Sequence, residues 1–235
     1  MKHTLILITL LIAGALFWVY GRSVWYPLYS KIKGKETVDS INRKYGKKAR
    51  KSLSSAFSEQ GFNELPSKIM LLAFKEERRM DLLAQKEGEW FKLKSYDFTA
   101  FSGKLGPKLK EGDKQIPEGI YEIEYLNPNS AFHLSMKVSY PNDFDRQKAQ
   151  QDNRTNPGGD IFIHGKDVTI GCIPIGDKMI EELFILASQT LDQGIRVVIC
   201  PWDFRVNPEF PVIESVDWEG ELYEMLMKEL GKYPN

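Results

Sequence analysis

Cysteine and histidine are scarce in this chain, which has two cysteines and three histidines among its 235 residues. Two cysteines cannot build the disulfide framework that holds many small secreted domains together. No group of histidines and cysteines has the spacing of a zinc site, which needs three or four ligands. A Cys-x-x-Cys motif is also missing, which argues against redox chemistry of the thioredoxin kind.

The chain has no excess charge of either sign, because 32 basic side chains balance 32 acidic ones. Nucleic-acid-binding proteins usually carry a surplus of Lys and Arg on one face, so nucleic acid is not expected as a main partner. One local basic cluster is interpreted as a solvated helix face, with contact to anionic wall polymer or lipid headgroups as the alternative. It consists of Arg43, Lys44, Lys47, Lys48, Arg50 and Lys51.

A long uncharged apolar run, Thr4 to Tyr20, lies near the start of the chain. Its length is at the short end of what spans a bilayer, and aromatic residues typical of a membrane interface lie at its end. Residues 1–22 are therefore predicted to form a transmembrane anchor, with a cleaved signal segment as the alternative. Both interpretations place the rest of the chain outside the cytoplasm. The basic residues after the run would by themselves favour the opposite orientation, and the catalytic interpretation below decides between the two.

The remainder of the chain divides at Pro66. Residues 23–65 are mixed polar and are predicted to be a helical linker with one or two short helices. From Pro66 the pattern changes to short apolar runs that alternate with polar positions, as is typical of strands. We predict strands at 68–74, 80–85, 90–98, 119–125, 132–140, 160–164 and 195–200, the first three forming an antiparallel meander.

Helices are predicted in the last third of the chain. Apolar residues at helical spacing follow Asp177, the predicted N-cap, and stop at Gly194. A proline-marked tail, 201–235, contains a second amphipathic helix. The segment from Pro141 to Gly159 has no apolar periodicity and is predicted to be a long polar loop of the kind that is often functional or mobile.

A thiol and an imidazole stand eight residues apart, at Cys172 and His164. Strand alternation puts Asp160 and His164 on one face, and Gly165 allows a sharp turn after the strand. Such a pair forms a nucleophile and its base, which indicates acyl transfer through a thioester. Backbone N–H groups around Gly171, Cys172 and Ile173 are candidates for an oxyanion hole.

Structural interpretations of the same residues stay open beside the catalytic one. An isolated cysteine is usually a small buried hydrophobic residue, as we predict for Cys200. A disulfide between Cys172 and Cys200 is a further possibility. His133 is predicted to be a structural strand residue. For a catalytic His164, the orienting partner is either Asp160 or a backbone carbonyl.

The motifs around these residues resemble the L,D-transpeptidase catalytic-domain (YkuD) family. That family carries a His-Gly pair, here His164-Gly165, followed by Ser/Thr-x-Gly-Cys, here Thr169-Ile-Gly-Cys172. The segments 102–108 and 112–121 also resemble the family's loop and Pro-x-Gly-x-Tyr strand. The resemblance covers about 68–200, and it identifies 66–200 as a catalytic domain.

The resemblance implies a β-rich α+β fold, a sandwich or barrel with a helix next to the active site. It also implies that the Cys172 thiolate attacks a peptidoglycan stem peptide at the L-configured centre of a diamino acid, so that a D-residue leaves. An amine or water then resolves the thioester, and no cofactor is needed. Thr169 and Gly165 are possible substrate or orienting residues. The catalytic domain would lie in the periplasm or cell wall.

Three departures from the family pattern bear on the outcome of the reaction. The loop between His164 and Cys172 is short, Ile170 stands where a second histidine is common, and Pro174 stands where Arg or Asn is common. The short loop resembles the branch that includes hydrolases of peptidoglycan crosslinks and of wall-attached lipoprotein. The alternatives to acyl transfer are therefore hydrolysis of the same bonds, as an L,D-carboxypeptidase or crosslink hydrolase, and a non-catalytic wall-binding module.

Overall fold

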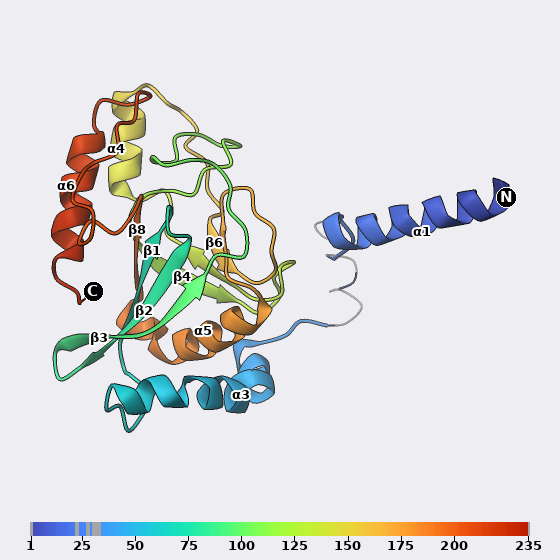
Figure 1. Ribbon diagram of the computed structural model, residues 1–235, viewed down its shortest axis with the longest axis horizontal. Helices are drawn as coiled ribbons and strands as arrows, with labels where there is room; N and C mark the ends of the chain where they lie inside the picture. Colours follow the sequence, from blue (N-terminus) through green and yellow to red (C-terminus); the bar gives the residue numbers. More distant parts are fainter. Residues whose placement is uncertain (1, 22–23, 27–28, 30–33, 235) are drawn as a thin grey trace.

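The computed structural model describes residues 2–21, 24–26, 29 and 34–234. Eight strands form one mixed sheet in the order β3-β2-β1-β8-β4-β5-β6-β7, which curls into half a barrel (Figure 1). The α+β class predicted from the sequence is confirmed. The strands are β1 (Ile69–Phe74), β2 (Arg79–Lys86), β3 (Glu89–Asp97), β4 (Gly119–Asn127), β5 (Ser135–Val138), β6 (Phe162–His164), β7 (Ile173–Pro174) and β8 (Arg196–Cys200).

The sheet has a separate apolar core on each face. Strand β1 shows this division, because all six of its residues are buried and successive side chains point to opposite faces. Leu71 belongs to the core on one face, and Leu72 belongs to the core on the other. A strand that is buried on both faces reads as a continuous apolar run, which explains the sequence IMLLAF.

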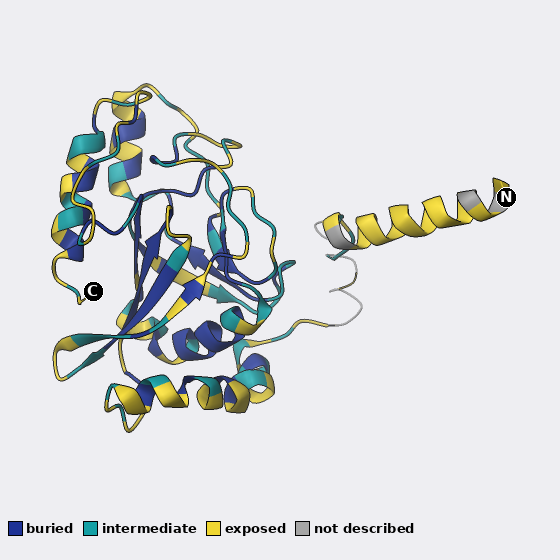
Figure 2. Ribbon diagram, viewed as in Figure 1, coloured by how far each residue is buried: buried dark blue, intermediate teal, exposed yellow. Residues whose placement is uncertain are grey.

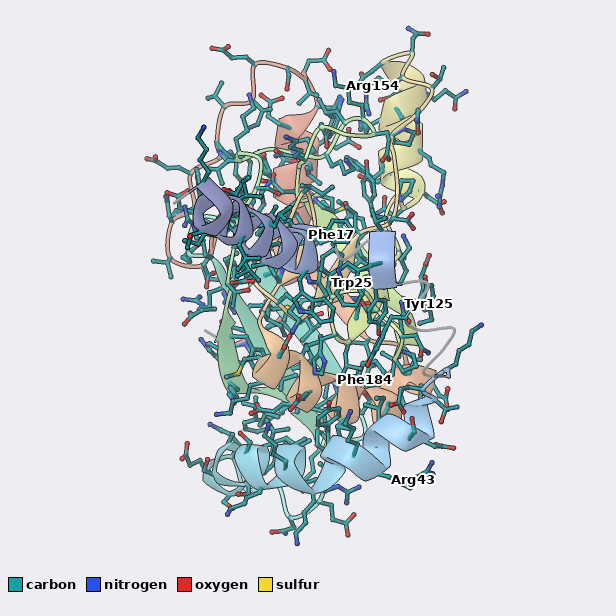
Figure 3. The ribbon with its side chains drawn as sticks, turned by 90° about the vertical axis from the view of Figure 1, so that its right-hand side faces the viewer. Phe17, Trp25, Arg43, Tyr125, Arg154 and Phe184 are labelled. Carbon is teal, nitrogen blue, oxygen red and sulfur yellow. The ribbon has the colours of Figure 1, made fainter. Side chains whose placement is uncertain are left out.

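Helices cover both faces of the sheet. Helix α5 (Asp177–Thr190) lies under one face, and α3 (Val38–Glu59) packs on the outer side of α5 (Figure 1). Figure 3 shows Phe184 in α5 between the sheet and α3, which Arg43 marks. Helix α6 (Glu219–Leu230) covers the opposite face through Leu222, Tyr223 and Leu226, all fully buried. A short 3₁₀ turn, η1 (Leu191–Gln193), follows α5.

The N-terminal apolar run forms helix α1 (Lys2–Tyr20), which extends away from the sheet (Figure 1). Its described side chains are exposed to solvent, as Figure 2 shows by colour. Within the described residues, no helix combines the length and apolarity needed to cross a membrane. The predicted transmembrane anchor therefore has no support from the structure, although the helix itself is present.

The loop predicted between the last two groups of strands was wrong in part, and the predicted linker helix is longer than expected. The segment 141–159 is not a loop throughout, because it contains helix α4 (Asp143–Gln151). This helix is mostly polar, so it has no apolar stripe, and its sequence signal is the capping box formed by Asn142 and Asp145. In the linker, α3 has 22 residues and is longer than the short helices predicted, and residues 24–26 are helical as well.

The carboxyl group of Asp145 is buried in the first turn of α4. The Asn142 side chain accepts a hydrogen bond from the Asp145 N–H at 2.9 Å, and the Asn142 N–H donates to Asp145 Oδ2 at 3.0 Å. Tyr121 donates to the other carboxyl oxygen at 3.4 Å. Burial outweighs these hydrogen bonds and raises the pKa of Asp145 to about 6.

We expect Asp145→Asn to remove a pH dependence of stability. The folded chain keeps this proton up to about pH 6, whereas the unfolded chain loses it near pH ~4. The stabilising contribution is therefore complete at low pH and is lost as the pH rises through the folded-state pKa. The free energy of unfolding of Asp145→Asn minus that of the wild type should increase by about 2 kcal/mol between about pH 4 and pH 7. Urea denaturation measures this, and a constant difference would contradict it.

Candidate active site

The pairing of β6 with β7 brings the two predicted catalytic residues to one place. The strands are parallel, with Ile163 beside Ile173. Continuing this register by one residue places Cys172 beside Phe162. Because side chains alternate along a strand, Cys172, Phe162 and His164 share one face, while the two isoleucines belong to the core on the other face.

The imidazole of His164 is buried and is held from two sides. Its Nδ1 lies 2.5 Å from the carbonyl oxygen of Gly165. A carbonyl can only accept a hydrogen bond, so Nδ1 carries the proton and Nε2 has a free lone pair. The Phe132 ring packs against the imidazole at an interplanar angle of 34°, with 4.8 Å between the ring centroids. Burial lowers the pKa of His164, although the Gly165 carbonyl opposes this, so the ring is neutral near neutral pH.

Of the two orienting partners considered for His164, the backbone carbonyl occupies the position. The Asp160 side chain is 92% exposed, and its Oδ1 lies 3.4 Å from Lys137 Nζ instead. The Asp160 main chain does contact the Cys172 thiol, because its carbonyl oxygen accepts a hydrogen bond from Cys172 Sγ at 3.5 Å. Asp160 therefore reaches the site through its backbone.

The turn after His164 is fixed to the start of α5. A Cβ atom on Gly165 would lie 2.6 Å from Asp177 Oδ1 and 2.9 Å from the Phe132 carbonyl oxygen, so the space excludes a side chain. The Lys166 N–H donates to Asp177 Oδ1 at 2.9 Å, and its ammonium group pairs with the other oxygen. Asp177 was predicted as the N-cap of α5, but it is the first helical residue, and Gly176 is the N-cap. The Asp177 carboxylate fixes the turn at Lys166 through these two contacts.

The Thr-x-Gly-Cys motif closes the other end of the loop. Thr169 Oγ1 accepts a hydrogen bond from the Gly171 N–H at 3.1 Å and donates to the Cys172 carbonyl oxygen at 2.7 Å. Gly171 has φ = 131°, and a Cβ atom there would lie 3.2 Å from the Gln115 carbonyl oxygen. The threonine hydroxyl and the glycine backbone thus set the direction from which Cys172 enters β7.

The Cys172 thiol is partly exposed, whereas Cys200 is fully buried, and both cysteines are free. Burial raises the pKa of Cys172; the Phe162 backbone N–H and the positive charges of Lys137 and Lys108 oppose this. No hydrogen bond joins Cys172 Sγ to the His164 ring among the contacts of the described residues. Both pKa shifts favour a neutral thiol and a neutral imidazole, whereas the family resemblance implied attack by a thiolate.

The three backbone N–H groups predicted as oxyanion donors differ in whether they already donate a hydrogen bond. The Gly171 N–H already donates to Thr169, and Ile173 lies inside the β6–β7 pairing. The Cys172 N–H has no hydrogen-bond partner within the part of the chain that the structure describes. Cys172 therefore carries the free donor of the three.

Sequence reasoning missed residues on the neighbouring strand. In β5, Ser135 pairs with His164 and Lys137 pairs with Phe162, so both polar side chains lie on the face of the site. In the sequence, these two polar residues alternate with the buried Met136, and this pattern could have identified the strand face on which they lie. Neither Phe132, whose ring packs against His164, nor Lys108 carried a recognisable pattern.

His133 lies away from the thiol. It was predicted to be a structural strand residue, but it lies outside β5, with φ = 77°. Its Nε2 lies 3.0 Å from Glu181 Oε1. Across the described ranges, no three His, Cys, Asp or Glu side chains are grouped as metal ligands would be.

Comparison with known proteins relates this site to a family. The sequence pattern of the L,D-transpeptidase catalytic domain, YkuD, matches residues 70–199, more than half of the chain. A protein of Escherichia coli strain K12 named "Putative L,D-transpeptidase YafK" is 33% identical over 141 residues, which are 58% of this chain and 55% of that protein. The chain thus matches about half the length of this curated relative.

Two solved structures match the chain at lower sequence identity. The helical cell shape determining protein Pgp2 from Campylobacter jejuni is 18% identical, with a TM-score of 0.47 and 77% of each chain covered. Bd1075 from Bdellovibrio bacteriovorus is 21% identical, with a TM-score of 0.42, covering 70% of this chain and 56% of that one. The resemblance seen in the motifs is confirmed by the family match: the chain belongs to the L,D-transpeptidase catalytic-domain family of peptidoglycan-modifying enzymes.

Proposed function

We propose that this chain is a cysteine-dependent acyltransferase that acts on peptidoglycan stem peptides, with Cys172 as nucleophile and His164 as base. The observation that carries the proposal is the shared face of the two residues, together with the hydrogen bond from His164 Nδ1–H to the Gly165 carbonyl. That bond leaves Nε2 as the nitrogen that can take the thiol proton.

The first half of the reaction forms a thioester. Nε2 of His164 accepts the thiol proton while Cys172 Sγ attacks the carbonyl carbon of the diamino acid in the stem. The Cys172 N–H donates to the oxygen that becomes negatively charged. The carbon–nitrogen bond then breaks, and the imidazolium returns its proton to the departing amine of the D-residue.

The second half releases the acyl group. An incoming amine or water loses a proton to Nε2 as it attacks the thioester carbonyl, and the sulfur leaves and regains a proton. An amine gives a new crosslink, and water gives a shortened stem. The raised pKa of Cys172 and the lowered pKa of His164 favour the neutral pair, so we expect proton transfer to accompany the attack on the carbonyl.

The proposed substrate also suggests where the chain acts. Peptidoglycan lies outside the cytoplasmic membrane, so the proposal places residues 66–200 in the periplasm or cell wall.

Incubation of the purified chain with defined muropeptides tests the proposal. Disaccharide-tetrapeptide alone, tetrapeptide with an acceptor stem, and a crosslinked dimer are supplied separately, and products are identified by mass spectrometry. We expect new dimers from the second sample. Shortened stems without dimers would indicate hydrolysis of the same bonds.

A carbapenem-type acylating agent provides an independent readout. Peptide mapping of the treated protein should find the adduct on Cys172 and not on Cys200, because Cys172 is the accessible thiol. Binding to muropeptides with no product and no adduct would reject the catalytic proposal in favour of a wall-binding module.

A further inference from the structure

Lys137 lies across β6 from the nucleophile. In the β5–β6 register Lys137 is beside Phe162, and Cys172 follows Phe162 on the other side of β6. The three side chains therefore form one row on the face of the site. The Lys137 ammonium group lies 5.2 Å from the centroid of the Phe162 ring, the residue between lysine and thiol. Tyr125, labelled in Figure 3, packs edge-on against the same ring at 6.3 Å.

The ammonium group of Lys137 is poorly satisfied for a buried cation. The residue is 8% exposed, and its ionic contact is Asp160 Oδ1 at 3.4 Å, a long distance to a carboxylate that is itself in solvent. Within the described chain its Nζ makes no hydrogen bond. Lys75 shows the contrast, because its buried Nζ donates to two carbonyl oxygens and pairs with Glu118 at 2.9 Å. Lys137 therefore has donors left for another anion.

We propose that Lys137 is a substrate-binding residue whose ammonium group holds a carboxylate of the acyl donor beside Cys172. This inference rests on the proposed function. Stem peptides carry carboxylates on both sides of the scissile bond, at the end of the departing D-residue and on the side chain of the diamino acid. A fixed cation in a partly buried site distinguishes a carboxylate from its amide, because the amide offers no charge to a buried ammonium group.

The nearby charges support a role in binding. Asp160 competes for the same ammonium group from the solvent side, so a substrate carboxylate would displace a weak partner. The positive charge of Lys137 also favours the ionised form of the Cys172 thiol. A role confined to the thiol would affect every donor equally, whereas a carboxylate site affects only donors that bear the group.

The test compares Lys137→Met and wild type on three donors: the free tetrapeptide, the same peptide amidated at its C-terminus, and the peptide amidated on the diamino acid. We expect Lys137→Met to lower kcat/KM about 10- to 100-fold on the free donor, mainly through KM. Lys137→Met should change kcat/KM little on the donor whose amide replaces the carboxylate that Lys137 binds. An equal loss on all three donors would overturn the proposal.

Asp160→Asn is the matched variant, because its side chain is exposed and asparagine tolerates the left-handed backbone at this position. Removing the competing carboxylate should lower KM for the free donor, an effect opposite to that of Lys137→Met. An unchanged or higher KM in Asp160→Asn would count against the site even if Lys137→Met failed to fold.

Binding separates this inference from the proposed function. In a Cys172→Ala background, calorimetry measures the affinity of the free and amidated peptides with and without Lys137→Met. Selective weakening of free-peptide binding supports the carboxylate site, even if the wild type turns over none of the donors. If the protein that keeps Lys137 binds the free peptide and both amidated peptides with equal affinity, the site is rejected, even if the wild type is an active transferase.

Discussion

Replacing Cys172 by alanine is expected to lower the rate of stem-peptide cleavage by at least about 10³-fold, because the substitution removes the thiol that forms the acyl intermediate in the proposed reaction. His164→Gln should cause a loss of similar size, since Nε2 accepts and returns the proton in both halves of the reaction. The double variant should be no slower than either single variant, as is usual for residues that act as a unit. Steady-state rates on muropeptides and the absence of an acyl adduct at residue 172 measure these effects.

Cys200→Ala is the control for this experiment. Its sulfur is fully buried in the core on the α6 side, so the substitution removes a thiol without touching the site. It should keep most of the activity, with some loss of stability. Retained cleavage in Cys172→Ala, at normal folding, would show that the chemistry resides elsewhere.

Breaking the buried ion pair between Lys75 and Glu118 should destabilise the fold by about 3 to 5 kcal/mol, because the remaining charge would stay buried without a partner. Both side chains are fully buried, and Nζ lies 2.9 Å from Oε1. Burial lowers the pKa of Lys75, and Glu118 opposes that shift. Tyr223 in α6 donates to Glu118 at 2.9 Å, so the pair joins the end of β1 to α6.

Urea denaturation of Lys75→Met, Glu118→Gln and the double variant measures the coupling. The double variant should lose less than the sum of the single losses, since it leaves no unpaired charge. Lys48 and Glu181 form a matched comparison at the same 2.9 Å, but Lys48 is exposed, so Lys48→Met should cost far less. Similar losses at the two lysines would contradict the assigned role of burial.

Local sequence patterns predicted much of the fold. Three short runs separated by polar turns between residues 68 and 98 predicted the meander that β1, β2 and β3 form. The spacing after Asp177 predicted α5, and the His-Gly and Thr-x-Gly-Cys motifs predicted which residues meet at the β6–β7 pair. These features depend on neighbours in sequence, which is why they could be predicted.

The features that could not be predicted depend on contacts between residues that are far apart in the sequence. Strand β8 lies between β1 and β4, and no local signal gives that order. Burial raises the pKa of Cys172 and lowers that of His164, and the extent of burial becomes known only when the surrounding strands are placed. Lys137 is an ordinary polar residue of an alternating strand until its register puts it beside Phe162.

The two-sided burial of β1 sets a minimum length for a soluble fragment. The family match ends at residue 199, before α6 begins. A chain shortened to that limit would leave Met70, Leu72 and Phe74 uncovered on one face of the sheet. Such a fragment would keep every residue of the proposed chemistry and would still be prone to aggregate, because it exposes a contiguous apolar patch.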